Sequence, residues 1–191
     1  MSSSEQVSDG SPNQLVRRLP SGAYMQETVI LVDDCDKQIG TAEKLQAHKE
    51  AQLHRAFSIF IFNKNGEMLL QQRAFTKYHS PGIWANACCG HPRPGETLET
   101  AVHRRLREEI GIDCALRKQL DYTYKVQFEN GLTEHEFLHV FVGTCDETPA
   151  PNSAEVRQVA WLSIGKIKAE LNAQPKKYAF WFQESMKRLF P

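Results

Sequence analysis

The sequence predicts an α+β fold in which mixed β-sheet layers are flanked by helices within a single domain. Short β-branched and aromatic runs dominate the middle of the chain, one amphipathic helix is clearly marked, and a long segment rich in Gly and Pro precedes that helix. A chain of 191 residues has room for one domain with a substantial core. Neither an internal repeat nor a second domain is visible.

The expected elements begin after a polar tail. Residues 1–23 are rich in Ser, Gly and Pro and are predicted to be flexible, so that the folded domain covers residues 24–191. The first strand is expected at residues 27–32, where Val and Ile are frequent, and it runs into an acidic turn at residues 33–36. Residues 44–52 have weak helical or loop character.

Two hairpins are expected in the middle of the chain, each around a turn that contains Asn and Gly. Strands at residues 56–62 and 67–72 flank the turn Asn63-Lys64-Asn65-Gly66, and strands at 122–128 and 134–142 flank a second turn. Between the hairpins lie a loop and a helix, and after them come a short strand and two helices. These five segments are expected at residues 73–96, 97–110, 156–162, 166–171 and 177–190.

The composition restricts the class of protein. The 23 basic and 23 acidic side chains give a formal net charge of zero, so neither nucleic acid nor an anionic membrane is an expected partner, and the surface is compatible with a monomer. The apolar runs are too short to span a bilayer, and the first residues resemble no targeting signal, so a cytoplasmic location is expected. The odd number of cysteines, 5, argues against a disulfide framework and for free thiols.

The helix predicted at residues 97–110 carries charges on its apolar face. Arg105 and Glu109 fall within the arc formed by the apolar residues Leu98, Ala101, Val102, Leu106 and Ile110. A structural ion pair between positions i and i+4 would explain the two charges. A cavity that holds a metal ion or a phosphate group would also explain them, because charges on an apolar face are costly unless they meet a partner.

The spacing of residues in the segment that ends in this helix favours the second explanation, a cavity that holds a metal ion or a phosphate group. It reads Gly90, five residues, Glu96, seven residues, then Arg104-Arg105-Leu106-Arg107-Glu108-Glu109-Ile110-Gly111-Ile112. This resembles the Nudix box, Gly-x5-Glu-x7-Arg-Glu-U-x-Glu-Glu-x-Gly-U, in which U is a bulky aliphatic residue, and implies a Nudix-like fold. Arg105 stands where the family has a Glu that helps hold divalent metals. The departure implies binding of a diphosphate without its hydrolysis.

The predicted loop at residues 73–96 contains a thiol and a histidine on either side of a glycine, in Cys89-Gly90-His91. Glycine allows close approach of the backbone to a ligand, and a loop of this length inside a compact domain is usually functional. A buried, inert cysteine is the simpler interpretation of Cys89 taken alone. Cys88 is interpreted as structural.

Further residues with metal-binding side chains lie elsewhere in the sequence. Glu134 and Glu136 are two apart on a predicted strand and therefore share a face, although charges at an exposed strand end are an equally simple explanation. His48 and His54 precede the first hairpin, and each alone would more often be a surface histidine. Together with His91, these residues have the donor chemistry of one divalent cation site that suits Mn²⁺, Zn²⁺, Fe²⁺ or, at the carboxylate end, Mg²⁺.

The motif Cys89-Gly90-His91-Pro92, the Nudix-like helix with Arg105, Tyr124 and Glu134-His135-Glu136 occur in an order that resembles the type 1 isopentenyl-diphosphate isomerase family. The resemblance runs from about residue 26 to the end of the chain. It implies an isomerase of isoprenoid biosynthesis that interconverts isopentenyl diphosphate and dimethylallyl diphosphate. The implied substrate is a small isoprenoid diphosphate.

The resemblance also implies a role for each matching residue. Cys89 and Glu136 are the acid–base groups on opposite faces of the isoprene unit, and Tyr124 forms a hydrogen bond beside them. The implied ligands of one Mn²⁺, Zn²⁺ or Mg²⁺ ion are His48, His54, His91, Glu134 and Glu136. Glu109 is implied to hold a Mg²⁺ ion that bridges the diphosphate. The implied substrate contacts are Lys44, Arg73, Lys77 and Arg105 at the diphosphate and Trp181 at the hydrocarbon.

Two other functions stay open on the sequence alone. One is a Nudix pyrophosphohydrolase that acts on a nucleoside diphosphate derivative. The other is a Nudix-like binding module without catalytic activity. The Arg105 departure argues against hydrolysis, and a full set of candidate catalytic residues argues against a module that has lost its activity.

Overall fold

The structure is a computed structural model that describes residues 17–18, 24–25, 27–77 and 80–191. The predicted flexible tail at residues 1–23 lies largely outside the described residues. Two residues of this segment form β1 (Arg17–Arg18), which pairs antiparallel with β2 (Tyr24–Met25), at the start of the predicted domain.

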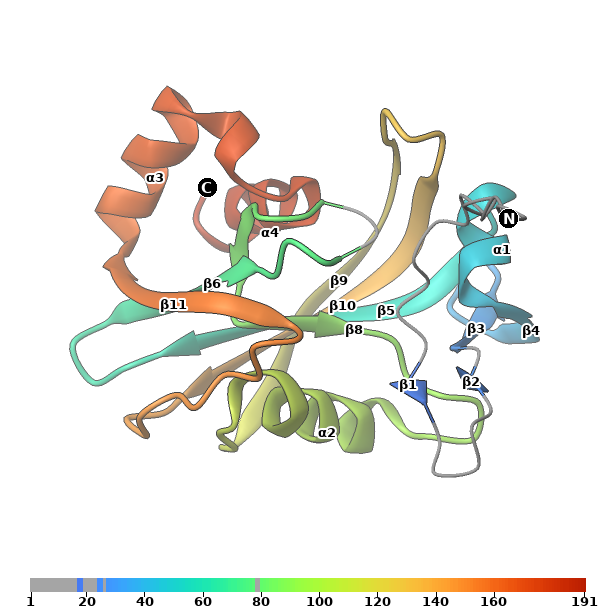
Figure 1. Cartoon of the computed structure of the whole chain (residues 1–191), viewed down its shortest axis with the longest axis horizontal. Helices are drawn as coiled ribbons and strands as arrows, with labels where there is room; N and C mark the ends of the chain where they lie inside the picture. Colours follow the sequence, from blue (N-terminus) through green and yellow to red (C-terminus); the bar gives the residue numbers. More distant parts are fainter. Residues whose placement is uncertain (1–16, 19–23, 26, 78–79) are drawn as a thin grey trace, which may run out of the picture.

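One large mixed sheet has helices packed on both of its faces, which agrees with the predicted α+β fold (Figure 1). The nine strands of this sheet and the helices around it follow one another in the order given next. They are β3 (Thr28–Val32), β4 (Gln38–Glu43), α1 (Lys44–Lys49), β5 (His54–Phe62), β6 (Glu67–Arg73), β7 (Trp84–Asn86), β8 (Cys88–Gly90), α2 (Leu98–Ile110), β9 (Leu116–Gln127), β10 (Thr133–Thr144), β11 (Val156–Ser163), α3 (Ile164–Ala173), a 3₁₀ turn (Pro175–Lys177) and α4 (Phe180–Leu189).

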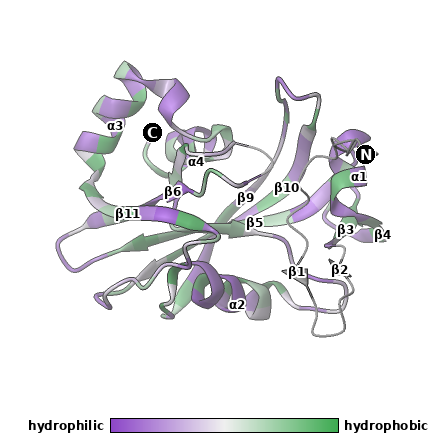
Figure 2. Ribbon diagram, in the orientation of Figure 1, coloured by the Kyte–Doolittle hydropathy of each residue, from purple (hydrophilic) through white to green (hydrophobic). Residues whose placement is uncertain are grey.

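The sheet is mixed, with the main strand order β11-β6-β5-β10-β9. β5 and β10 are parallel neighbours, whereas β9 and β11 pair antiparallel with β10 and β6. Helix α2 covers one face of the sheet, and α3 and α4 cover the other (Figure 1). Each face has its own apolar core, one around Leu106 of α2 and one around Phe182 of α4. Hydrophobic stretches lie in the middle of the sheet between these cores, whereas β11 and one end of β10 include hydrophilic stretches (Figure 2).

The two strands of the β5–β6 hairpin diverge beyond the turn. We call this open hairpin the fork and its two strands the prongs. Its two strands pair only at Phe62 and Met68, next to the turn. Further on, β7 pairs with β6 and β8 pairs with β5, so residues 84–90 fill the space between the two prongs. The prediction of an unbroken loop over residues 73–96 is therefore wrong in its middle. These two strands have three residues each, too few to show a period, and they form because the open hairpin offers unpaired edges.

Two further differences concern strands with little apolar character. β4 was not expected, and its residues are exposed or half-buried. β9 begins at Leu116 rather than at residue 122, and its first half carries charged residues along an outer edge of the sheet. Both are stabilised by pairing with a neighbouring strand rather than by burying a face. Among the described residues, no helix is long and apolar enough to span a bilayer.

Helix α2 begins and ends as its sequence predicts. The Thr97 side chain accepts a hydrogen bond from the backbone N–H of Thr100, and Gly111 closes the helix in the left-handed conformation, with φ 76°. A Cβ atom at Gly111 would lie 2.5 Å from the backbone oxygen of Ala150. The glycine therefore allows the 145–155 segment to cross the end of the helix, where the N–H groups of Ala150 and Asn152 donate to Ile110 and Glu109.

Replacing Gly111 with Ala is expected to destabilise the protein through both strain and contact. The left-handed conformation costs an alanine about 1–2 kcal/mol, and relieving the contact with Ala150 adds about 1–3 kcal/mol. Gly66 provides the matched control, because it has φ 74° and its added Cβ would meet nothing within 4 Å. Urea unfolding of both variants measures the difference. Equal losses for Gly111→Ala and Gly66→Ala would contradict the close crossing.

Candidate active site

A cavity of about 400 Å³ lies where the two prongs of the fork meet α2, β10 and α4. Its walls combine an apolar patch with many ionisable groups. All of the predicted catalytic and substrate-binding residues line it. They are Cys89, Glu136, Tyr124, Lys44, Arg73, Lys77, Arg105 and Trp181. Of the predicted metal ligands, His91, Glu134, Glu136 and Glu109 also line it.

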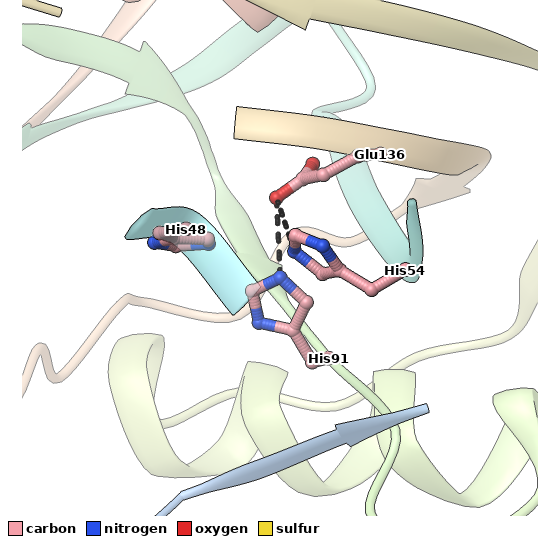
Figure 3. Close-up of side chains that lie close together, drawn as sticks. All are labelled: His48, His54, His91 and Glu136. Atoms are coloured by element: carbon pink, nitrogen blue, oxygen red, sulfur yellow. Dashed lines mark hydrogen bonds and ion pairs between the residues drawn. The ribbon is translucent and has the colours of Figure 1, made fainter. Parts of the chain in front are cut away.

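Three histidines and one carboxylate converge beside this cavity (Figure 3). His48 comes from α1, His54 begins β5, His91 follows β8, and Glu136 lies on β10. One potential ligand atom from each lies within 4.8 Å of the others. The parallel register places Glu136 directly beside His54. The sequence separates these residues by up to 88 positions (136 − 48). The β5–β10 pairing brings Glu136 to His54, and the β5–β8 pairing brings in the segment that ends at His91.

The protonation of this cluster suits a metal ion. Burial, and then the neighbouring imidazole of His91, lower the pKa of His48 to about 3, and burial lowers the pKa of His91 to about 4. Burial opposes ionisation of Glu136, yet the neighbouring imidazoles of His54 and His91 hold its pKa well below the usual value. Neutral imidazoles beside an ionised carboxylate are the forms that coordinate a divalent cation.

His54 is oriented for the same purpose. Its Nδ1 lies 2.8 Å from the backbone oxygen of Gln52, which can only accept, so Nδ1 carries the hydrogen. In the neutral imidazole the lone pair is then on Nε2, which is fully buried, makes no hydrogen bond within the described part of the chain and lies 3.7 Å from Oε1 of Glu136. A buried nitrogen lone pair aimed at a carboxylate is repulsive unless a cation lies between them, so these residues fit a bound divalent ion.

Tyr124 joins the two glutamates of β10. Its hydroxyl lies 2.9 Å from Glu134 and 2.7 Å from Glu136, and all three side chains are buried. Both glutamates point to the same face, as their spacing predicted. Burial, and then the charge on Glu136, raise the pKa of Glu134 to about 8. Glu134 is not among the four residues whose ligand atoms lie within 4.8 Å of one another, and it contacts the cluster through Tyr124.

The thiol of Cys89 is held on the wall formed by β8. Its Sγ lies 3.3 Å from Oγ of Ser58 and 3.3 Å from Oδ1 of Asn86. Burial raises the pKa of this thiol to about 12. Cys88, which points to the other face, is fully buried in the core beneath α2. Ser58 and Asn86 were missed from the sequence because their proximity to Cys89 depends on how the fork is filled.

Part of the cavity wall is cationic, and three of the predicted diphosphate-binding cations pair with carboxylates. Lys44 pairs with Glu27 at 2.7 Å, Lys77 pairs with Glu155, and Arg105 pairs with Glu109 and lies 3.5 Å from Glu155. Arg105 and Glu109 thus form the ion pair that the helix pattern allowed, and they also face the cavity. Glu155 had no signal in the sequence, since it precedes β11 in an irregular segment.

Trp181 of α4 provides an apolar wall and is 4% exposed. The guanidinium carbon of Arg73 lies 5.4 Å from the centre of its ring, which joins the cationic end of the cavity to the aromatic wall. The outer part of the Nudix-like segment has a structural role. Arg104 forms two hydrogen bonds of 2.7 Å with Glu96 and so fixes the loop to the helix.

Comparisons with known proteins agree with this geometry. The model of the NUDIX domain matches residues 52–182. The isopentenyl-diphosphate Delta-isomerase 2 of Photorhabdus laumondii is 49% identical over 84% of this chain and 90% of its own length. The isopentenyl-diphosphate Delta-isomerase of Burkholderia multivorans is 49% identical over 86% of this chain and 93% of its own length.

Solved structures support the fold alone. A Deinococcus radiodurans protein superimposes with a TM-score of 0.72 at 20% identity, over 86% of this chain and all of the other (100%). A MutT protein from Methanosarcina mazei superimposes with a TM-score of 0.59 at 22% identity, over 71% of this chain and 91% of the other.

Proposed function

The chain belongs to the NUDIX family and, within it, to the isopentenyl-diphosphate Delta-isomerases, and we propose that its cavity catalyses their reaction with Cys89 and Glu136 as the two proton-transfer groups. The reaction interconverts isopentenyl diphosphate and dimethylallyl diphosphate in isoprenoid biosynthesis, so the substrate is a small isoprenoid diphosphate. The observation that carries the proposal is the presence of Cys89, Glu136 and the cationic cluster in the walls of one cavity.

The proposed chemistry moves a double bond by one position. One proton is added to the terminal carbon of the alkene, and another is removed from the carbon on the far side of the double bond, so the proton count is unchanged. Two acid–base groups that approach a flat substrate from opposite faces meet this need. Glu136, with Tyr124 beside it, serves one face, and Cys89 serves the other. The charge that develops on the branched carbon is stabilised by the ring of Trp181.

The proposed metal site contains His48, His54, His91 and Glu136, with Glu134 as a fifth ligand. The donor set fits Mn²⁺, Zn²⁺ or Mg²⁺. An ion bound there supplies a positive charge that makes a neighbouring carboxylic acid or phenol a stronger proton donor. At the other end, Glu109 is proposed to hold a Mg²⁺ ion against the diphosphate, while Lys44, Arg73, Lys77 and Arg105 bind and orient the phosphate oxygens.

A Nudix hydrolase remains the closest alternative activity. Arg105 occupies the position of a metal-binding carboxylate, and its guanidinium pairs with Glu109. Burial opposes its charge, but the carboxylate of Glu109 raises the pKa of Arg105, so a cation is fixed there. This arrangement favours retention of the diphosphate over its cleavage. A cytoplasmic location and a monomeric state remain predictions.

Metal removal is expected to abolish isomerisation. Purified protein is incubated with isopentenyl diphosphate, and dimethylallyl diphosphate and released phosphate are followed by ¹H and ³¹P NMR. Activity should be lost after treatment with a chelator and should return with Mn²⁺ or Zn²⁺ in the presence of Mg²⁺. Chelation should also lower the melting temperature, because a ligand present at 100 times its Kd contributes about 2.7 kcal/mol of stability.

Three other outcomes of this experiment would contradict the proposed function or its metal site. Release of phosphate from nucleoside diphosphate derivatives, without isomerisation, would establish the hydrolase. Binding of isopentenyl diphosphate without turnover in metal-loaded protein would establish a non-catalytic module. Full activity in chelator-treated, metal-free protein would exclude the proposed metal site.

A further inference from the structure

The side-chain amide of Asn86 has only one possible orientation. Its Nδ2 lies 3.0 Å from the backbone oxygen of Ile59 and 2.8 Å from that of Cys88. Both of these atoms can only accept, so an amide rotated by 180° would place its oxygen against two carbonyl oxygens. The side chain is fully buried, so such a rotation would leave its amide hydrogens without these acceptors and would be costly. Its Oδ1 therefore faces the sulfur of Cys89 as a fixed acceptor.

This orientation determines the hydrogen bonds of the sulfur. Because Oδ1 of Asn86 cannot donate, the contact of 3.3 Å is an S–H donated by Cys89. The thiol has only one hydrogen, so the second contact of 3.3 Å must be an O–H donated by Ser58 to the sulfur. Ser58 is also fully buried and is the register partner of Cys89 across the β5–β8 ladder. The sulfur thus has an acceptor on one side, a donor on the other and the cavity in front.

We infer that Ser58 and Asn86 are a positioning pair for Cys89. The Asn86 amide oxygen accepts a hydrogen bond from the thiol when the thiol hydrogen is not directed at the substrate. The Ser58 hydroxyl donates a hydrogen bond that stabilises the sulfur when the thiol hydrogen leaves. The inference rests on the proposed function and deepens it. A negatively charged sulfur gains a hydrogen bond from Ser58 and is repelled by Oδ1 of Asn86, so the two residues act in opposite directions. This holds whichever of Cys89 and Glu136 protonates the alkene.

The positions of Asn86 and Ser58 between β5, β7 and β8 explain how these two side chains reach Cys89. Asn86 ends β7, Cys89 lies within β8, and the amide of Asn86 bridges the short link between them to Ile59 on β5. A smaller or apolar residue at 86 would remove one hydrogen-bond donor from each of two backbone carbonyl groups. Ser58 has no such structural duty in its side chain, since its Oγ contacts Cys89 alone among the described hydrogen bonds. Ser58 is therefore the position at which the catalytic effect can be separated from folding.

Ser58→Ala is expected to lower kcat about 10–100-fold with little change in KM, since hydrogen bonds to charged groups are worth about 1.5–3 kcal/mol. The matched control is Ser185→Ala, which removes another fully buried serine hydroxyl, 2.9 Å from Tyr122 on a different part of the sheet. Both variants should lose similar stability, and only Ser58→Ala should lose turnover. Ser58→Thr, which keeps the hydroxyl, should recover most of the lost kcat.

A second measurement does not depend on turnover. The S–H stretching band of Cys89, isolated as the infrared difference between wild type and Cys89→Ser, should be displaced toward low frequency by donation to Asn86. The band should persist at low frequency in Ser58→Ala, because that change leaves the acceptor in place. A band at the frequency of a free thiol would overturn the assignment of Asn86.

The kinetic outcomes separate this inference from the proposed function. Wild-type protein that fails to isomerise would overturn the proposed function. Wild-type activity with equal kcat in Ser58→Ala and Ser185→Ala would leave the function standing and would overturn the role of Ser58. A rise in KM with unchanged kcat in Ser58→Ala would also contradict it, since it would indicate a substrate contact instead.

Discussion

Replacing Cys89 with Ala is expected to lower kcat for isomerisation about 10²–10⁴-fold, the range that a positioned acid–base group contributes. The substrate should still bind, because the substitution leaves unchanged the cationic groups that are proposed to hold the diphosphate. The loss should therefore appear in kcat with little change in KM. ¹H NMR in deuterated solvent measures both turnover and the exchange of substrate hydrogens, and exchange at the carbon served by Cys89 should disappear.

The neighbouring cysteine provides an exacting control. Cys88 is fully buried and belongs to the core beneath α2, so Cys88→Ala removes one atom from that core and should cost about 1 kcal/mol of stability. Its turnover should match wild type. The two variants differ by one position in the chain and by the face of β8 that they affect. Full activity in Cys89→Ala, or equal loss in both variants, would remove the thiol from the mechanism.

Glu136→Gln is expected to lower both kcat and metal content. The carboxylate contacts His91 at 3.1 Å and Tyr124 at 2.7 Å, and its Oε1 lies 3.7 Å from His54. An amide would weaken metal coordination and could not transfer a proton, so kcat should fall at least about 10²–10⁴-fold. Metal content is measured by mass spectrometry of the purified protein, and turnover by the NMR assay with metal in excess.

Two other positions test whether the loss is specific to the cluster. His139 is buried on the same strand but contacts Asp36, 3.0 Å away, on the other side of the sheet. His139→Gln should therefore disturb β10 without loss of metal or turnover. Glu134→Gln should lose less metal than Glu136→Gln, because Glu134 is not among the four residues whose ligand atoms lie within 4.8 Å of one another. Wild-type metal content and turnover in Glu136→Gln would contradict the proposed site.

The sequence predicted the elements whose apolar or charged residues repeat with the periodicity of a helix or a strand. Helix α2 spans Leu98–Ile110, within one residue of the helix predicted at residues 97–110. The shared face of Glu134 and Glu136 follows from the alternation of a strand and is also confirmed. In both cases, the signal lies within about a dozen residues and results from local geometry.

What the sequence could not predict depends on contacts between distant segments. β7 and β8 exist because the open hairpin leaves edges to fill, and no local pattern marks such edges. The same is true of Ser58, Asn86 and Glu155, which acquire their roles only through cross-strand or loop contacts with Cys89, Lys77 and Arg105. Family resemblance supplied the residues proposed for the reaction, but it did not point to Ser58, Asn86 or Glu155, which contact them.

The internal ion pairs at the cationic end of the cavity affect how quickly a substrate finds it. Lys44, Lys77 and Arg105 each already neutralise a carboxylate, and the whole chain has a formal net charge of zero. Such an arrangement projects little field into the solvent, so a dianionic molecule is not drawn in from a distance. Capture then depends on random encounter followed by an exchange of partners at short range. The association rate should accordingly vary little with ionic strength.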